Sequence, residues 1–213
     1  MSDSPPALSI GEEIANSISH GLGLILALIA LPVLVFSAIE IGSTQFTVGV
    51  AVCGATMVLL YLASTLYHSV THQSAKRFFR LFDHSAIFLL IAGTYTPFTL
   101  GVLRGAWGWT LLAVVWCLAL AGIVIKAFPR TRHSWFCMAL YLVMGWLAIV
   151  AIKPIWELVP VPGIVLILAG GLAYTGGLAF FAARSLRYGH FIWHLFVLAG
   201  TTCHFFAVLW YGA

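Results

Sequence analysis

The stretch Phe46–Tyr67, FTVGVAVCGATMVLLYLASTLY, contains no charged side chain and is apolar over most of its length. An α-helix needs about 20 such residues to cross the hydrocarbon core of a bilayer. Because lipid offers no hydrogen bonds, a spanning segment must bond all its backbone groups internally, as a helix does. This stretch therefore predicts a transmembrane helix.

The same pattern recurs along the rest of the chain, and connectors with charged residues, proline or glycine separate the apolar stretches. No alternation of polar and apolar residues typical of barrel strands is present. The sequence predicts an all-α integral membrane protein, a seven-transmembrane helix bundle that forms a single domain over residues 1–213. The predicted spans are Ser17–Ile39, Phe46–Tyr67, Ser85–Leu103, Trp107–Phe128, Ser134–Ile152, Gly163–Ala183 and Phe191–Tyr211.

The composition agrees with this class and excludes others. Of the 213 residues, 62% are hydrophobic and only 8% are charged, whereas soluble domains carry about 25% charged residues. A soluble enzyme, a disordered tail and a nucleic-acid-binding domain are excluded, so no nucleic-acid partner is expected.

The positions of the basic residues predict the orientation. Of the 10 lysines and arginines, only Arg104 and Lys153 lie in connectors that follow odd-numbered spans. Basic connectors stay in the cytoplasm, so we expect the amino terminus inside and the carboxyl terminus outside. The net charge of +4 reflects this topology. Residues 1–16 then form a short cytoplasmic segment, in which Glu12 and Glu13 belong to a lead-in helix.

Histidine is the polar residue that needs an explanation, because the chain has 8 of them and ionisable residues in spans mark sites. On the predicted topology all but His204 lie near the cytoplasmic ends of the helices. His204 is deeper, about 21 Å from His190 along the last span at 1.5 Å per residue. Clustering alone is weak evidence, since polar residues favour interfaces in any membrane protein.

Spacing adds a more specific signal. His190 and His194 are four residues apart, so they share one helix face and can bind one ion together. Ser64 and His68 have the same relation, and Asp83 begins the third span at the same depth. Three imidazoles, one carboxylate and a hydroxyl suit a tetrahedral zinc ion with one position left to water.

Other interpretations of these polar residues stay open at this point. The structural alternatives, which need no metal, are an interfacial pair of hydrogen-bonded histidines and an ion pair between Arg80 and Asp83. His20 is either a support of the site or an interfacial residue, and Tyr95 either lines a cavity or packs. His204 is expected to be a hydrogen-bonded core histidine. The histidines expected at the hydrated cytoplasmic rim are His72, His84 and His133.

Taken together, these motifs resemble the haemolysin III family. That family belongs with the progestin and adipoQ receptors, which include the adiponectin receptors, and is more distantly similar to alkaline ceramidases. The resemblance covers all seven predicted spans, and the short chain suits the bacterial branch. Its motifs are Ser64-x3-His68, Asp83 and His190-x3-His194, supported by Glu13–Gly21, Asp83–Ile87, Gly93–Phe98 and His190–Phe205.

The resemblance implies that His68, His190 and His194 hold zinc near the cytoplasmic side of the membrane. It also implies that Asp83 contacts or orients the zinc-bound water, with Ser64 nearby, and that the protein resides in a bacterial inner membrane. One departure is Phe191, because bacterial relatives usually carry glutamate after the first histidine of this motif. A role for that glutamate in supporting the site is therefore in doubt in this chain.

The leading functional hypothesis is a zinc-dependent intramembrane hydrolase of lipid amide or ester bonds, as the ceramidase resemblance implies. Bound zinc generates hydroxide near neutral pH and polarises a carbonyl, and Asp83 could accept the proton of the water. The expected partners are membrane lipids, either ceramide-like or other acyl lipids, and the role is lipid homeostasis.

Three alternatives accompany this hypothesis. Zinc that ties the second and last spans together could be structural, in a membrane sensor or homeostasis protein without enzymatic activity. A cytolytic pore-former, which the family name suggests, fits less well because seven uncleaved spans make a resident membrane protein. A transporter would need polar residues across the whole membrane depth, where only His204 lies far from the cytoplasmic layer.

Overall fold

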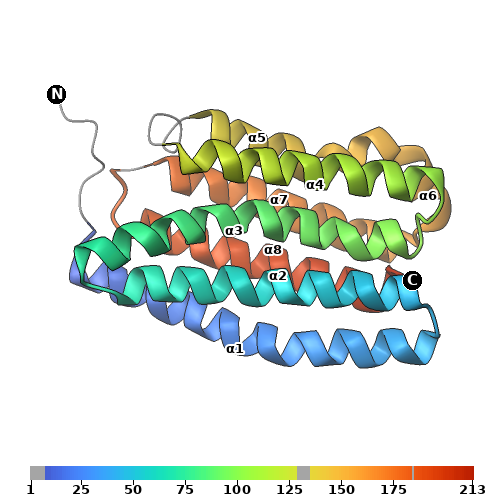
Figure 1. The fold of residues 1–213 in the computed structure, drawn as a ribbon, viewed down its shortest axis with the longest axis horizontal. Helices are drawn as coiled ribbons and strands as arrows, with labels where there is room; N and C mark the ends of the chain where they lie inside the picture. Colours follow the sequence, from blue (N-terminus) through green and yellow to red (C-terminus); the bar gives the residue numbers. More distant parts are fainter. Residues whose placement is uncertain (1–7, 129–134, 184) are drawn as a thin grey trace.

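Long helices lying side by side make up the part of the chain described by this computed structural model, residues 8–128, 135–183 and 185–213 (Figure 1). No strand occurs within those ranges. The uncharged apolar stretch Phe46–Tyr67 lies inside α2. The elements are α1 (Ile10–Ile41), α2 (Thr44–Ser69), α3 (Gln73–Leu100), α4 (Ala106–Ala127), α5 (Trp135–Gly145), the 3₁₀ helix η1 (Leu147–Ala151), α6 (Ile152–Leu158), α7 (Val161–Ala182) and α8 (Gly189–Tyr211).

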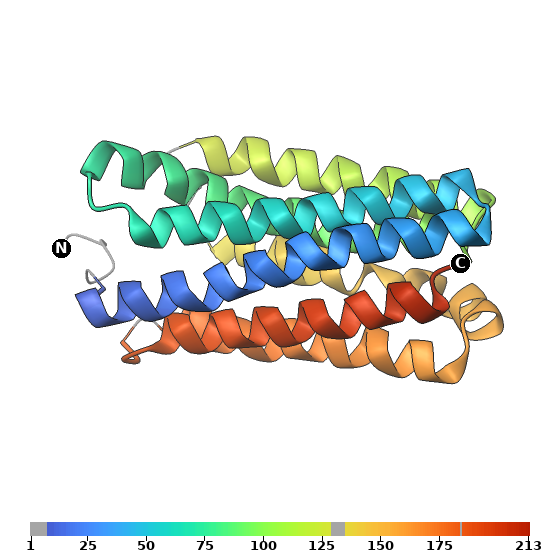
Figure 2. The same ribbon diagram turned by 90° about the horizontal axis from the view of Figure 1, so that it is seen from below.

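The helices pack as a closed ring. Each of α1 to α4 contacts the next helix in sequence, α5 contacts α7, α7 contacts α8, and α8 returns to α1. Figure 2 shows the closure, with α8 running beside α1. The start of α1 lies at one end of the bundle, and the end of α8 lies at the opposite end (Figures 1 and 2).

Within the described part of the chain, six segments are long and apolar enough to cross a membrane: α1, α2, α4, α7, α8 and the run Trp135–Leu158. The seventh predicted span, Ser85–Leu103, lies in α3, which is not among these six. The first three turns of α3 carry Lys76, Arg77 and Arg80, and its second half contains threonine, tyrosine and proline. The all-helical membrane architecture is confirmed, and the count of seven spans stays a prediction.

Two helices, α1 and α3, begin well before the spans that were predicted in them. α1 begins at Ile10, since Ser9 and Glu12 form a reciprocal capping box at its start, the arrangement that satisfies the first free N–H groups of a helix. The expected lead-in helix is thus continuous with the first span. α3 begins at Gln73, so most of the connector predicted over 71–83 is helical.

The predicted span Ser134–Ile152 is interrupted. α5 ends at Gly145 and the chain continues as η1 and α6, so the predicted connector Lys153–Pro162 is partly helical as well. The hydroxyl of Tyr95 bridges the break: it donates to the Gly145 carbonyl at 3.0 Å and accepts from the Ala148 N–H at 3.0 Å. Non-helical backbone at membrane depth is tolerated where it lines a cavity or is buried in protein, and both Gly145 and Ala148 line the cavity described below.

Small residues let neighbouring helices approach closely. A methyl group on Gly93 of α3 would clash with the side chain of Thr56 on α2. A methyl group on Gly177 of α7 would lie 2.5 Å from Cβ of Phe196 on α8. Close approach at small residues is typical of helices that pack within membranes, and here it holds α2 against α3 and α7 against α8.

Candidate metal centre

Three histidines from two helices meet inside one end of the ring. His68 lies in the last turn of α2, whereas His190 and His194 lie one turn apart at the start of α8. Their candidate ligand atoms all lie within 4.8 Å of one another. The structure thus brings together the three residues that were predicted to bind zinc.

Hydrogen bonds determine which ring nitrogen of His68 is available. Its Nδ1 lies 2.7 Å from Oε2 of Glu13 on α1, and the side-chain amide of Asn16 is 3.5 Å from the same nitrogen. A carboxylate only accepts hydrogen bonds, so Nδ1 carries the proton. The other nitrogen, Nε2, is buried and has no partner within the described residues, which leaves its lone pair available to a metal.

His194 is held in the same way by α1. Its Nδ1 lies 3.1 Å from the Ser19 hydroxyl and 3.2 Å from the backbone carbonyl of Asn16. Because a carbonyl only accepts, this Nδ1 also carries the proton and Nε2 is left for a ligand. The Nε2 of His190 is buried without a partner in the part of the chain that is described.

His20 packs against the cluster but does not join it. Its ring stacks on His194 with centroids 3.5 Å apart and planes 8° from parallel, and it is 3% exposed. It is not one of the three grouped ligands. Of the two roles left open, the structure places His20 in support of the site rather than at the water interface.

Asp83 and Ser64 lie beside the three histidines. Asp83 is buried on α3 and lines the same cavity as His190 and His194, close enough to interact electrostatically with His68 and with Lys126 on α4. Ser64 is one turn before His68 on α2 and fully buried. Asp83 is not part of the ligand group, so that group supplies three candidate ligand atoms, all from histidine.

The donor set fits zinc. Neutral imidazoles at this spacing are ligands for zinc, and catalytic zinc sites keep three protein ligands and one open position. Calcium and magnesium prefer a cage of oxygen ligands, which this cluster lacks. Unpartnered buried nitrogens are costly unless something binds them, and Nε2 of both His68 and His190 is in that state.

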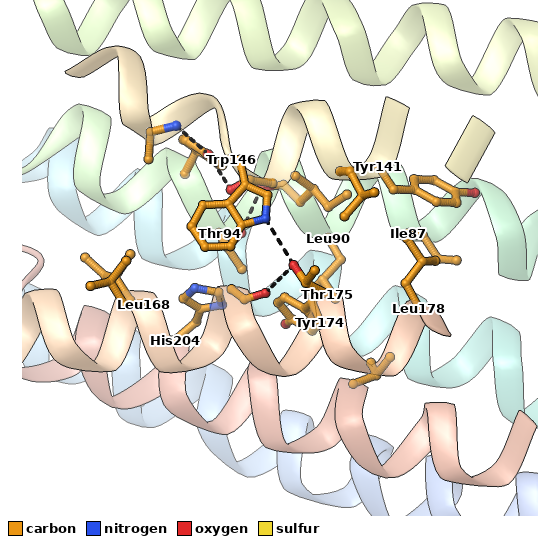
Figure 3. Close-up of a pocket in the computed structure, with 18 of the residues that line it drawn as sticks. Ile87, Leu90, Thr94, Tyr141, Trp146, Leu168, Tyr174, Thr175, Leu178 and His204 are labelled. Atoms are coloured by element: carbon orange, nitrogen blue, oxygen red, sulfur yellow. Dashed lines mark hydrogen bonds between the residues drawn. The ribbon is translucent and has the colours of Figure 1, made fainter. Parts of the chain in front are cut away.

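A long, mostly apolar cavity of about 170 Å³ leads away from the histidines. It begins at His190, His194 and Asp83 and follows α8 to His204, a distance of about 21 Å from His190 at 1.5 Å per residue. Figure 3 shows its middle part, where Trp146 donates to Thr175 at 3.0 Å between walls of aliphatic residues from α3 and α7. Tyr95 also lines it, so the cavity-lining role considered for Tyr95 is confirmed.

The other histidines differ in part from expectation. His72 precedes α3 and is exposed, as expected of a rim residue, and His133 lies outside the described residues. His84 is only partly exposed and lines the cavity, with its Nδ1 bonded to the Arg80 carbonyl at 2.7 Å, so a rim position for it is wrong. His204 also lines the cavity, and its Nδ1 has no hydrogen-bond partner in the described ranges.

Of the supporting residues on α1, only His20 was given a possible role in the site from the sequence, and Glu13 and Asn16 entered the site prediction only as part of the motif Glu13–Gly21. Glu13, Asn16 and His20 are spaced by three and four residues, which places them on one helix face. A polar face on the first helix of a membrane bundle must point inward. A carboxylate hydrogen-bonded to one of the three histidines thus comes from Glu13, in a chain that has Phe191 where relatives were expected to carry glutamate.

Comparison with known families agrees with this geometry. The family model described as haemolysin-III related matches residues 8–205, a range that contains all three histidines. The chain belongs to the haemolysin III family. The resemblance found from the sequence motifs is therefore confirmed.

Two relatives within the haemolysin III family are closely similar to this chain. Hemolysin-3 of Bacillus cereus is 50% identical over 202 residues, which cover 95% of this chain and 92% of that protein. The hemolysin-3 homolog of Bacillus subtilis (strain 168) is 47% identical over 203 residues, 95% of each chain. A more distant likeness, 25% over 165 residues, is to the human monocyte to macrophage differentiation factor, of which 66% is covered.

Proposed function

We propose that this haemolysin III protein is a zinc-dependent hydrolase of lipid amide or ester bonds that acts within the membrane. One observation carries the proposal: three histidines, two buried and one half-buried, lie with their candidate ligand atoms within 4.8 Å of one another at the end of a long apolar cavity. A polar site that opens into an apolar space suits a substrate with a polar linkage and an alkyl chain.

The residues around the histidines have separate roles in this proposal. Bound zinc would lower the pKa of a water toward 7 and polarise the substrate carbonyl. Asp83 is the acid at this end of the cavity, and its carboxylate would take and hold the proton of the attacking water before passing it to the leaving amine or alcohol. The buried Ser64 hydroxyl would hydrogen-bond the reacting groups beside it.

The cavity would hold the acyl chain. Its walls between Asp83 and His204 include Leu90, Leu168 and Leu178 (Figure 3), and burying each methylene against such a wall stabilises the complex by about 0.8 kcal/mol. A length of about 21 Å along α8 accommodates a long-chain acyl group, so ceramide-like lipids are the substrate class that fits.

We further propose the topology that this function requires. If α3 also crosses the membrane, the ring has seven spans, with the amino terminus inside and the carboxyl terminus outside. The metal centre then lies at the cytoplasmic side of the bacterial plasma membrane, since His68 and His190 are near the cytoplasmic ends of α2 and α8.

The test is lipid hydrolysis by the purified protein. Incubated with long-chain ceramides in nanodiscs, it should release fatty acid, and Asp83→Asn should lower the rate by about 10²–10⁴-fold. His194→Ala should remove activity, whereas His72→Ala, at an exposed position away from the cluster, should keep it. Turnover that is unchanged in His194→Ala would overturn the mechanism.

A second function is favoured by one feature, the position of the ligands on helices far apart in sequence. Zinc between α2 and α8 would tie two parts of the ring together, as in a non-enzymatic sensor or homeostasis protein with a structural metal. If zinc removal lowers thermal stability and no lipid is hydrolysed before removal, this second function is favoured over the first.

A further inference from the structure

We infer that Glu13, in the first turns of α1, is a positioning residue of the metal centre. Its carboxylate holds His68 in the tautomer and orientation that direct Nε2 to the ion. The inference rests on the zinc site of the proposed function but not on hydrolysis.

The first step is the bond itself. Glu13 Oε2 and His68 Nδ1 are 2.7 Å apart, a length typical of charge-assisted hydrogen bonds. Since the carboxylate accepts, the proton stays on Nδ1 and the lone pair on Nε2. A carboxylate behind a ligand histidine fixes the ring and raises its basicity toward the metal, and loss of such a partner lowers metal affinity by about 10–100-fold.

The second step is that Glu13 is itself held in place. Its other oxygen, Oε1, lies 2.7 Å from Nζ of Lys76 at the start of α3. The first turn of α1 is also hydrogen-bonded to the residue that caps α8, because the backbone N–H of Tyr188 donates to Oε1 of Glu12 at 2.9 Å. The start of α1 therefore contacts all three helices that surround the candidate site.

The third step is a thermodynamic consequence. Zinc on Nε2 of His68 favours the tautomer with a proton on Nδ1, and that tautomer is the donor to Glu13. Coupling between two binding events is reciprocal, so zinc binding should strengthen the attachment of the start of α1 to the bundle. Zinc removal should then speed hydrogen exchange in residues 8–20.

The experiment compares zinc affinities of the full-length protein in detergent, stripped of metal and titrated with zinc against a competing chelator. Glu13→Ala should raise the Kd by about 10–100-fold. Glu13→Gln keeps an oxygen that accepts from Nδ1, so it should recover part of the affinity. Glu12→Gln makes the same chemical change one position away from the histidine contact, so its Kd should stay close to that of the unmodified protein. Lys76→Met removes the cation that holds Glu13 but leaves the carboxylate on His68, so it should raise the Kd less than Glu13→Ala does.

The second readout is hydrogen exchange of residues 8–20 with and without zinc. We expect zinc to protect this segment in the unmodified protein and in Glu12→Gln, and to protect it much less in Glu13→Ala.

The same Kd in Glu13→Ala and the unmodified protein would overturn the inference and leave the zinc site intact. An equal loss in Glu12→Gln and Glu13→Gln would also overturn it, because helix order rather than the bond to His68 would then explain the effect. Failure of the unmodified protein to bind zinc would overturn the site and the inference together, whereas absence of lipid hydrolysis would affect neither readout.

Discussion

At the scale of single residues, the candidate site depends on which nitrogen of each histidine carries a proton. His68 and His194 both use Nδ1 for hydrogen bonds to α1, with Glu13, Ser19 and the Asn16 carbonyl as partners. Nε2 of both rings is thereby left without a proton, and the candidate ligand atoms of the three histidines lie within 4.8 Å of one another. Such preorganisation lets binding energy go to the metal rather than to turning the rings.

The first prediction concerns metal content. The protein isolated without chelators should contain zinc, and the double variant His190→Ala/His194→Ala should contain none, because a single histidine does not hold the ion. His72→Ala serves as the control and should keep the metal. Elemental analysis of the purified proteins measures this, and absence of zinc from the unmodified protein would contradict the central proposal.

The second prediction concerns the break between α5 and η1. Tyr95→Phe removes a donor to Gly145 and an acceptor for Ala148 at once. A buried backbone group left without a partner costs about 1–3 kcal/mol, so this variant should unfold at lower temperature or denaturant concentration. Tyr67→Phe, outside the break, provides a comparison in unfolding assays. Equal stability of Tyr95→Phe and the unmodified protein would show that water or another group hydrogen-bonds the Gly145 carbonyl and the Ala148 N–H in place of Tyr95.

The three grouped histidines were predictable, whereas most of their partners on α1 were not. His190 and His194 lie four positions apart, so their meeting follows from helix geometry alone. The approach of His68 was expected from its depth in the predicted topology and from the family resemblance, since nothing local brings the end of α2 to the start of α8. The bond from Glu13 to His68 joins positions 55 residues apart and depends on the rotation of α1 about its axis, which the hydrophobic pattern specifies only coarsely.

At the scale of helices, apolar length predicted the six described segments that are long and apolar enough to cross a bilayer, but not where they begin or break. α3 extends through a basic stretch that was taken for a connector, because charged residues form helix readily in the absence of Pro and Gly. The break after Gly145 was not predictable from hydropathy, since the sequence stays apolar across it. Its partner Tyr95 lies 50 positions earlier in sequence.

The third prediction tests helix packing with two glycines of α7. A methyl group on Gly177 would overlap Phe196 and Trp193 of α8, whereas one on Gly171 would meet Trp146 at 4.0 Å, an ordinary contact. Gly177→Ala should therefore destabilise the protein by about 1–3 kcal/mol, and Gly171→Ala should be neutral or slightly stabilising. Thermal unfolding in detergent compares the two, and equal effects would argue against tight packing of α7 on α8.

At the scale of the whole molecule, the ring encloses the cavity and gives the bundle two different ends. The fourth prediction is the orientation of those ends. In a version without the native cysteines, a cysteine placed at Gly105 should react with a membrane-impermeant thiol reagent added to intact cells, and one placed at Gln73 should react only after lysis. The reverse pattern would invert the proposed topology.

The fifth prediction concerns zinc as a link across the ring. His68 on α2 and His194 on α8 are separated by α1, so a shared ion would join helices that are not neighbours. A ligand that binds only the folded state stabilises it by about 2.7–4.1 kcal/mol at free concentrations of 100–1,000 times Kd. Chelation should lower the melting temperature, and added zinc should restore it. His194→Ala should melt at the same temperature with and without chelator.

The contact between Ser19 and His194 joins positions that are 175 residues apart in sequence, and this separation has a consequence for biosynthesis. Ribosomes add about 5–20 residues per second, so roughly 10–35 seconds pass between the emergence of α1 and that of α8. During this interval His68 is already matched by Glu13, but the other ligands have not been made. If the proposed zinc site is correct, metal capture is among the last events in the biosynthesis of the chain, and the metal-bound form would report that the final helix has been inserted correctly.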